Sequence, residues 1–375
     1  MTLKQILEEA KKNGITLADV RAEVNRQYAA MGGTKSQFNK LEIGPDQYQE
    51  CKKTGKTLTQ LLEELDPSAN YEGVSLDAFE RQLAVRGLNI SGRQAVTLEE
   101  FYDPDNRPLF PEFIDREVKA GLVMGRHELA DTDLIATETE IDSGTYENAL
   151  VDMTGDFRSK IIPEGTKFPV ITISIDEKTV SLQKHGALIK ETYEHRRRIR
   201  ANKMAVFLRL VGWYMKKDMA EAAVLIAING NSGNSNSASS DTMTGLNYNN
   251  LVDFWAEFSP YESDTLIVPK AGLTAMLKIN EFKDAMIAAN WLTKGELITP
   301  LGHTLKRHDP TTSSVLANKV LGVDTRFCLE GLTEAGSYLV ETDKIIDGQW
   351  NEIAISIVRG YAKIIAEAAR VWDYS

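Results

Sequence analysis

The 375-residue sequence has a formal net charge of −11, with 42% hydrophobic and 26% charged residues. This length is enough for about two or three domains and a sizeable core, and the ordinary composition excludes wholesale disorder. The acidic balance argues against a protein that coats nucleic acid by neutralising phosphates, although it leaves room for a local basic face.

Cysteine and histidine are too scattered to indicate a disulfide framework or a metal site. Cys51 and Cys328 lie far apart, and the one close histidine pair, His303 and His308, is not in an HExxH arrangement. The N-terminus, MTLKQILEEAKKNG, is charged and amphipathic rather than a secretory signal. The longest apolar run, from Met204 to Met215, is too short to span a bilayer. We expect a soluble protein made in the cytoplasm, with no cofactor, metal or membrane contact.

The first hundred residues predict short helices with recognisable N-termini. Capping boxes begin at Thr16 and Thr97, and Ser75 precedes the apolar stripe of Leu76, Phe79 and Leu83. Polar segments bearing glycine and lysine separate these helices, so residues 1–74 are predicted to form an extended, loosely packed arm. Residues 131–165 are acidic and polar, and FPVITISIDEKTVSLQ (168–183) alternates like a half-exposed strand. Together they predict a long β-hairpin that projects from a core.

A long helix is predicted from about Lys190 to Ile228, interrupted only by Gly212 and ending at a Gly/Asn/Ser-rich linker, 229–245. After it we expect a helix at 248–258, a strand at 265–269 and a helix at 271–289. The segments 337–342 and 352–358 flank an Asp347-Gly348 turn, which predicts a hairpin. GYAKIIAEAARV (360–371) fits either helix or strand, and we favour strand.

The start of the long helix, YEHRRRIRANK (193–203), is the most basic run of the chain. Residues 184–203 carry a net charge of +5, from seven basic and two acidic residues. On a continuous helix Arg196, Arg200 and Lys203 share one face, which continues as Phe207, Leu210, Val211 and Tyr214. This predicts that the first turns protrude and that the rest is buried nearly all round.

No motif in the sequence indicates catalysis. The loop GNSGNSNS lacks the lysine of a P-loop and follows a helix, and no GxSxG elbow is present. The many carboxylates of residues 131–164 lie in a polar, glycine-dotted segment, which is more typical of a solvated face, or of one that meets a basic partner, than of a buried acid pair. We therefore expect no catalytic residue and no enzyme activity.

The phrases AFERQLAVRG (78–87) and RPLFPEFIDREV (107–118) are followed by EGTKFPVITIS, a long helix ending in NGN, and a C-terminal GYAKIIAEAARVWD. In these phrases and in this order of elements, residues 75–375 resemble the major capsid proteins of tailed bacteriophages. Residues 1–74 fall outside the resemblance. It implies an α+β fold of the Hong Kong 97 type, with an N-terminal arm, an extended β-hairpin loop, a long spine helix, a discontinuous peripheral domain and an axial domain.

The resemblance also implies a division of the chain. Its six segments are a helical arm or scaffolding-like extension (1–74), an N-arm (75–142), the extended loop (143–180), the peripheral domain with the spine helix (181–228), the axial domain (229–325) and the C-terminal part of the peripheral domain (326–375). Intersubunit contacts are expected at Lys160, Glu164, Lys167, Arg196, Arg197, Arg200 and Lys203. The basic run at 193–203 would pair with the acidic loop segment of a neighbouring subunit, contact packaged DNA phosphates, or be solvated. In some family members a loop lysine is crosslinked to an asparagine of another subunit, which implies Lys160 or Lys167 with Asn351 here.

The implied function is structural. The chain would assemble into pentamers and hexamers of an icosahedral or prolate phage head that encloses double-stranded DNA by weak, non-specific contact. It would be made in the host cytoplasm, become part of the virion, and meet scaffolding, portal and decoration proteins. The alternative is an encapsulin-type nanocompartment shell, which has the same fold but encloses cargo protein.

Overall fold

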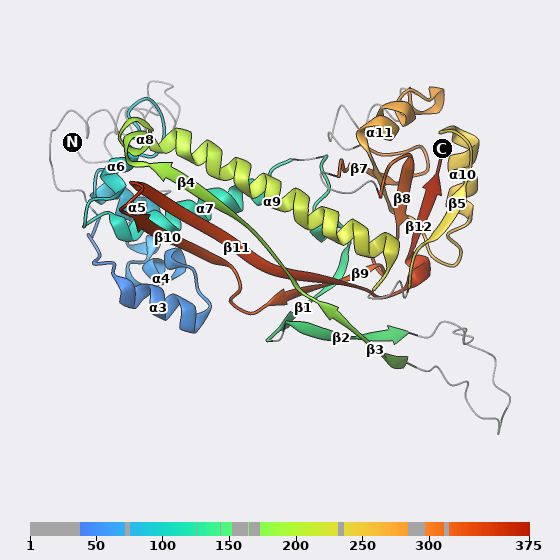
Figure 1. The fold of residues 1–375 in the computed structure, drawn as a ribbon, viewed down its shortest axis with the longest axis horizontal. Coiled ribbons are helices and arrows are strands. Elements are labelled where there is room, and N and C mark those ends of the chain that lie inside the picture. Colours follow the sequence, from blue (N-terminus) through green and yellow to red (C-terminus); the bar gives the residue numbers. More distant parts are fainter. Residues whose placement is uncertain are drawn as a thin grey trace, which may run out of the picture. The chain divides into compact units, whose positions relative to one another are not determined.

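The computed structural model describes residues 38–71, 76–125, 127–142, 144–151, 164, 173–231, 236–283, 297–310 and 315–375. The chain divides into two compact units, which are described separately. Unit 1 comprises Met1–Val96 with Glu100–Leu109, and unit 2 comprises Thr97–Glu99 with Phe110–Ser375 (Figure 1). The mixture of helices and sheets is that of the predicted α+β class.

The described part of unit 1 is helical. Its elements are α3 (Pro45–Thr54), α4 (Leu58–Leu65), η1 (Ser68–Asn70), α5 (Ala78–Val85) and η2 (Arg107–Leu109), and α6 (Leu98–Phe101) spans the division between the units. Helix α5 starts after Asp77, not after the predicted Ser75. The Asp77 carboxylate accepts a hydrogen bond from the Glu80 N–H at 2.9 Å, and the Glu80 carboxylate accepts one from the Asp77 N–H at 3.2 Å. This capping box satisfies two N–H groups that the helix itself leaves unpaired.

A small apolar cluster joins the helices of unit 1. Its buried members come from α3, α4 and the first turn of α5, and they are Cys51, Leu58, Leu61, Leu62 and Ala78. Residues 38–71 are therefore packed rather than loose. The predicted boundary between residues 74 and 75 falls inside this unit, and the division into six segments stays a prediction.

Arg81 of α5 is fully buried and holds three parts of unit 1 together. Its guanidinium donates to the Ser68 hydroxyl at 2.6 Å and to the Glu63 carboxylate at 3.2 Å. It also donates to the backbone oxygen of Asp66 at 2.5 Å, and the Asp66 carboxylate lies 3.8 Å away. These contacts pair the two terminal nitrogens of the guanidinium, and the buried Asp66 carboxylate offsets its charge.

We expect Arg81→Met to destabilise unit 1 by about 3–5 kcal/mol, because it leaves the buried Asp66 carboxylate without its cation. Hydrogen exchange of the α4 and α5 peptides measures the loss. The matched control is Lys56→Met, which breaks an exposed pair between Lys56 and Glu64 and should cost less than about 1 kcal/mol. Equal effects of the two substitutions would contradict the role given to Arg81.

Unit 2 contains a first sheet of five strands, β1 (Ile135–Ile141), β4 (Gln183–Thr192), β9 (Leu329–Glu334), β10 (Leu339–Ile345) and β11 (Trp350–Lys363). The order is β1-β9-β11-β10, and β4 also pairs with β11. Strand β11 lies antiparallel to β10 and β4 along its first half and to β9 along its second. The predicted hairpin at Asp347-Gly348 is confirmed as β10–β11.

The second sheet has the order β5-β12-β8-β6-β7. Its strands are β5 (Ser239–Thr242), β6 (Thr265–Val268), β7 (Thr304–Arg307), β8 (Lys319–Val323) and β12 (Ala369–Asp373). Helix α10 (Tyr248–Ala256) packs Phe254 on the sheet, where it meets Trp372 and Phe258 in a buried cluster. The predicted helix at 248–258 and strand at 265–269 are confirmed in outline. The strand favoured at 360–371 is confirmed only at its two ends, because β11 ends at Lys363, a 3₁₀ turn follows at Ala366–Ala368, and β12 begins at Ala369 in the other sheet.

Helix α11 (Lys270–Met276) is shorter than the predicted helix at 271–289. A 3₁₀ turn, η5 (Asn280–Lys283), follows it and brings Phe282 into the same buried cluster as Trp372. Packing of that aromatic ring therefore outweighs continuation of the helix. Residues 284–289 lie outside the described part of the chain.

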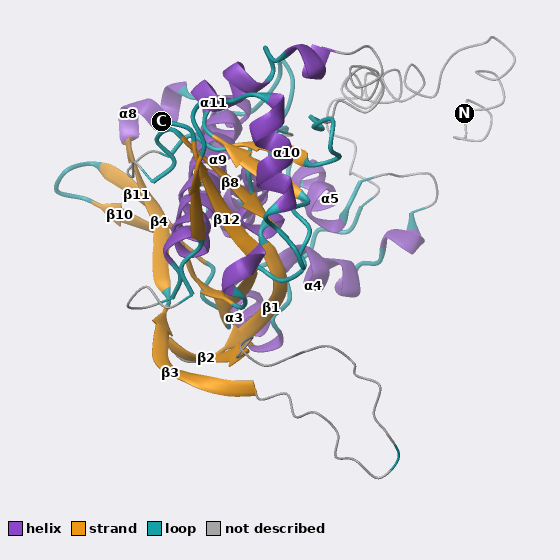
Figure 2. Cartoon of the chain, turned by 90° about the vertical axis from the view of Figure 1, so that its right-hand side faces the viewer, coloured by secondary structure: helices purple, strands orange, loops and turns teal. Residues whose placement is uncertain are grey.

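The predicted hairpin is confirmed in part: β2 (Thr145–Val151) is antiparallel to β3 (Ile173–Ser181) in a separate two-stranded sheet, whereas residues 135–141, which were predicted to belong to the hairpin, form β1 of the first sheet. Figures 1 and 2 both show β2 and β3 extending away from the two larger sheets of unit 2. Of the loop between these strands, only Glu164 is described, and it is exposed.

The helix predicted from Lys190 is wrong at its start. Strand β4 continues to Thr192, where a cross-strand ion pair of 2.8 Å between Lys190 and Glu352 supports it. Thr192 then caps a short helix, α8 (Tyr193–Arg198), and Ile199 takes an extended conformation before α9 (Ala201–Asn229) begins. The Ile199 carbonyl accepts a hydrogen bond from the Leu98 N–H at 3.1 Å. This external pairing explains why the helix does not run through residues 199 and 200.

Helix α9 ends at Asn229, as predicted, and packs closely against α7 (Phe110–Val123). A Cβ atom on Gly121 would clash with the backbone of Arg209, and one on Gly212 would clash with the backbone of Val118. These glycines let the two helices approach each other at the crossing. The C-terminal half of α9 buries Ala220, Ala223, Val224 and Ala227 in a cluster shared by both large sheets. The short 3₁₀ turns η3 (Asp131–Asp133) and η6 (Ala366–Ala368) flank this cluster.

Candidate subunit-interaction surfaces

The basic run at 193–203 makes ion pairs inside its own chain. The Arg197 guanidinium donates to the Glu99 carboxylate at 3.3 Å, and Arg196 lies 4.0 Å from the same carboxylate. The side chain of Arg196 is 14% exposed, whereas that of Arg197 is 68% exposed. Glu99 was not predicted as a partner, because it precedes the run by almost a hundred residues and no sequence pattern links them.

The predicted face through Arg196, Arg200 and Lys203 does not exist as one helical face. Arg196 belongs to α8, while Arg200 is the residue that precedes α9. Arg200 and Lys203 are exposed, and whether they or the other predicted contact residues touch another copy stays a prediction.

An exposed apolar strip follows the first half of α9, contrary to the predicted burial. It consists of Val206, Phe207, Leu210 and Tyr214, which are between 42% and 59% exposed. The opposite side of this half of the helix is the one that packs on α7 through Gly212. The first half of α9 therefore has one side packed on α7 and one side exposed, and only its second half is enclosed. Periodicity predicted a helix buried nearly all round because the residues on the exposed side are also apolar.

The acidic stretch predicted as a solvated or partner-facing surface is partly used inside unit 2. Asp131 lies 2.5 Å from the Arg359 guanidinium and accepts a hydrogen bond of 2.9 Å from the Tyr361 hydroxyl. Burial, followed by the Asp131 charge, raises the pKa of Tyr361 well above its ordinary value. Glu138 also binds Arg359, at 2.8 Å, and Asp133 pairs with Lys306 at 3.1 Å. These partners come from β7 and β11, which are far away in the chain, so no local pattern predicts them.

The base of the β2–β3 hairpin is fixed by packing and by hydrogen bonds. Val180 of β3 is buried with Leu332 and Ala362, which belong to the first sheet. On β2, the Tyr146 hydroxyl donates to the Glu330 carboxylate at 3.3 Å. Because the hairpin is anchored at its base, it leaves the two larger sheets of unit 2 in a defined direction.

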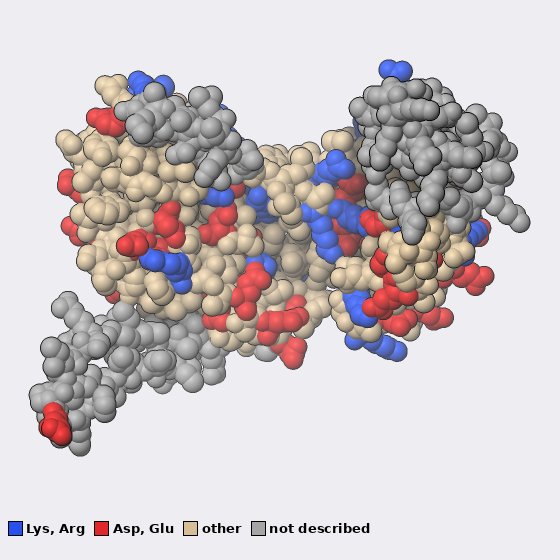
Figure 3. All heavy atoms as spheres, turned by 180° about the vertical axis from the view of Figure 1, so that it is seen from behind, with Lys and Arg blue, Asp and Glu red and all other residues tan. Residues whose placement is uncertain are grey.

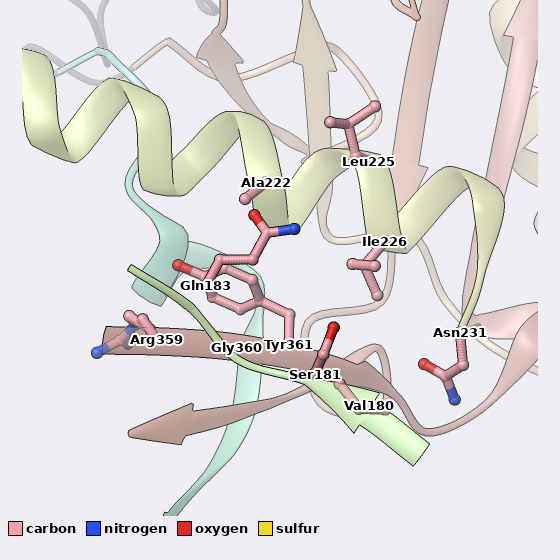
Figure 4. Close-up of a pocket in the computed structure, with 10 residues that line it drawn as sticks. All are labelled: Val180, Ser181, Gln183, Ala222, Leu225, Ile226, Asn231, Arg359, Gly360 and Tyr361. Atoms are coloured by element: carbon pink, nitrogen blue, oxygen red, sulfur yellow. The ribbon is translucent and has the colours of Figure 1, made fainter. Parts of the chain in front are cut away.

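A cavity of about 230 Å³ lies beside this anchor (Figure 4). It is lined by Gln183 at the start of β4, by Ala222 and Ile226 of α9, and by Arg359 and Tyr361 of β11. The hairpin base, α9 and β11 therefore meet around an unfilled space.

The two lysines predicted for crosslinking, Lys160 and Lys167, lie outside the described residues. Glu164 is exposed in the same loop. Asn351, the predicted acceptor, is on β11 and only 2% exposed. The crosslink stays a prediction, and it would require Asn351 to become accessible.

The described residues form neither a metal site nor a membrane-spanning helix. In those ranges no group of three or more His, Cys, Asp or Glu side chains could hold a metal ion. Cys51 and Cys328 are both buried, and burial raises the pKa of the Cys328 thiol to about 12. Nor does the described chain contain a helix that is both long enough and apolar enough to cross a membrane. On the face drawn in Figure 3, Lys and Arg side chains are interspersed with Asp and Glu.

Comparison with known proteins gives similarities at the level of structure. No family model matches the sequence, and no curated protein matches it. The capsid of the cyanophage P-SCSP1u is similar at 9% identity and a TM-score of 0.45, covering 67% of this chain and 90% of that chain. A virus-like particle from Pyrococcus furiosus is similar at 14% identity and a TM-score of 0.45, covering 70% and 98%.

The encapsulin complex of Synechococcus elongatus is also similar, at 13% identity and a TM-score of 0.43, covering 64% of this chain and 85% of that chain. The capsid of a gene transfer agent is similar as well, at 15% identity and a TM-score of 0.46, covering 68% of this chain and 93% of that chain. Identities and TM-scores this low give no residue-by-residue equivalence, so the assignments that follow rest on the contacts of this chain.

Proposed function

We propose that this chain is the major capsid protein of a tailed phage and assembles through pentamers and hexamers into a closed shell around double-stranded DNA. The observation that supports this most is the β2–β3 hairpin, which pairs only within itself among the described strands and extends from an anchored base. A compact monomer gains little from such an element, whereas a shell built from many copies gains contact area from it.

The parts of unit 2 take distinct roles in this proposal. The hairpin and the loop at its tip serve as the extended loop, α9 as the spine helix, and the first sheet as the peripheral domain. The second sheet, with α10 and α11, serves as the axial domain, which meets its copies at the symmetry axes. Each interface is weak, so that assembly can correct its errors, and the number of copies makes the shell stable.

The basic run contributes less to DNA binding than its charge suggests, because Arg196 and Arg197 are already paired with Glu99. We propose that the shell contacts DNA weakly and non-specifically, since the chain is acidic overall. The protein is then a virion component, assembled in the host cytoplasm with scaffolding, portal and decoration proteins as its partners.

Electron microscopy of the purified full chain tests the proposal. We expect capsomers or closed shells by negative stain, with or without a scaffolding protein. A protein that stays monomeric under all of these conditions would refute it. Shells that enclose a specific cargo protein instead of DNA would identify the alternative, an encapsulin-type compartment.

A further inference from the structure

Glu191 and Asn351 face each other on adjacent strands in the interior of unit 2. The register of β4 and β11 places them directly opposite one another, so both side chains lie on the same face of the sheet. Glu191 is 3% exposed and Asn351 is 2% exposed. Among the described residues, neither carboxylate oxygen of Glu191 and neither amide atom of Asn351 has a hydrogen-bond partner. Unsatisfied buried polar groups are rare, so a pair of them on facing residues requires an explanation.

Charged groups from three other segments surround this pair. Lys344 of β10 is in register with the buried asparagine, and its Nζ lies 5.1 Å from the centre of the Tyr193 ring. Arg196 of α8 lies against the same ring, at 5.2 Å, and 4.0 Å from the carboxylate of Glu99. Of these groups, Arg196 is the one whose charge acts on the carboxyl of Glu191.

The protonation state of Glu191 decides which neighbour it can bind. Burial raises the pKa of Glu191 to about 7, and Arg196 opposes this increase by favouring the ion. A neutral carboxyl has an O–H that can donate to the amide oxygen of Asn351 across the strands. An ionised carboxylate only accepts, and its strongest available donor is the guanidinium of Arg196.

We propose that Glu191 and Asn351 form a latch that is operated by a proton. In the neutral state Glu191 donates to Asn351 Oδ1 and holds the end of β4 against β11, while Arg196 stays beside Glu99. In the ionised state the carboxylate attracts Arg196 away from Glu99, and α8 moves with it. The latch is a property of the folded chain and does not depend on the proposed shell function.

The sign of the pH dependence follows from the direction of the shift. The carboxyl has a pKa of 4.5 in the unfolded chain and about 7 in the folded one. Between these values the folded state holds a proton that the unfolded state has lost. The contribution of Glu191 to stability is therefore fully present below pH 4.5 and is lost as the pH rises through about 7.

Hydrogen exchange of the peptide spanning residues 189–200 tests the latch in the full chain. After correction for intrinsic exchange rates, we expect protection to fall roughly tenfold between about pH 6 and about pH 8. Glu191→Gln keeps a donor at every pH, so its protection should not change over this range. If the protection of this peptide in the wild type does not change between about pH 6 and about pH 8, the proposal is overturned, and no variant is needed to show it.

Glu194→Gln is the matched control, because it removes the same charge from an exposed residue of α8. It should follow the wild-type profile, and loss of the pH dependence in this variant would mean that general charge, not the latch, is responsible. Asn351→Leu removes the acceptor, so it should lower protection of the peptide at about pH 6 to the level that the wild type shows at about pH 8. Unchanged protection in that variant would also contradict the proposal.

Discussion

Gly212→Ala should destabilise unit 2 even though alanine is the better helix former. In an exposed helix this substitution gains about 1 kcal/mol. Here the added Cβ meets the backbone of Val118, which cannot rotate away as a side chain would. We expect a loss of about 2 kcal/mol for alanine and about 3 kcal/mol or more for Gly212→Val, because α7 and α9 must separate. Urea unfolding, followed by circular dichroism, measures both.

Val206→Ala provides the comparison on the exposed side of the same helix. It should change stability by less than about 0.5 kcal/mol. If Gly212→Ala proves neutral or stabilising, the two helices do not approach each other as closely as their glycines indicate. Gly121→Ala, which meets the backbone of Arg209, should reproduce the effect from the other helix.

Removing the tip of the β2–β3 hairpin should abolish shell assembly and leave the subunit folded. Val151 and Ile173 are directly opposite in the register, so an Asn-Gly turn can replace residues 152–172 without disturbing either strand. The anchor at Val180 is retained, so we expect the melting temperature to change by less than about 4 °C. Sedimentation velocity and negative stain should show capsomers or monomers in place of shells.

The control for this deletion replaces residues 152–172 with a Gly/Ser linker of equal length. It should also fail to form shells if the side chains of the loop make the contacts. Normal shells from the shortened protein would show that the loop is dispensable for assembly. A wild-type protein that never assembles is a different outcome, and it would refute the proposed function itself.

Much of unit 2 could be predicted because its elements have local sequence signals. The hairpin at Asp347-Gly348 is flanked by alternating strands, and the end of α9 is marked by Asn229 and Gly230. The start of the long helix could not be predicted, because Lys190 and Glu191 are compatible with helix and become strand through pairing with β11. That pairing joins residues about 160 positions apart and leaves no mark near either one.

The candidate interaction surfaces were less predictable than the fold. The basic run was recognised from composition, but its partner Glu99 and the exposed strip on α9 follow from tertiary packing. The latch shows the same limit: a glutamate beside a lysine in a strand looks like a surface residue. Glu191 differs from the exposed glutamates around it because it lies opposite Asn351 in the β4–β11 register and is buried there. Both properties follow from tertiary structure.

The positions of β11 and β12 within their sheets have a consequence for biosynthesis. Strand β11 lies between β10 and β4 and also pairs with β9, and β12 lies between β5 and β8. Neither sheet can close until residues 350–373 have left the ribosome, although their partners begin as early as residue 183 in the first sheet. Folding of unit 2 therefore cannot be completed while only its earlier strands exist, so any association of folded copies must wait until β11 and β12 have been synthesised.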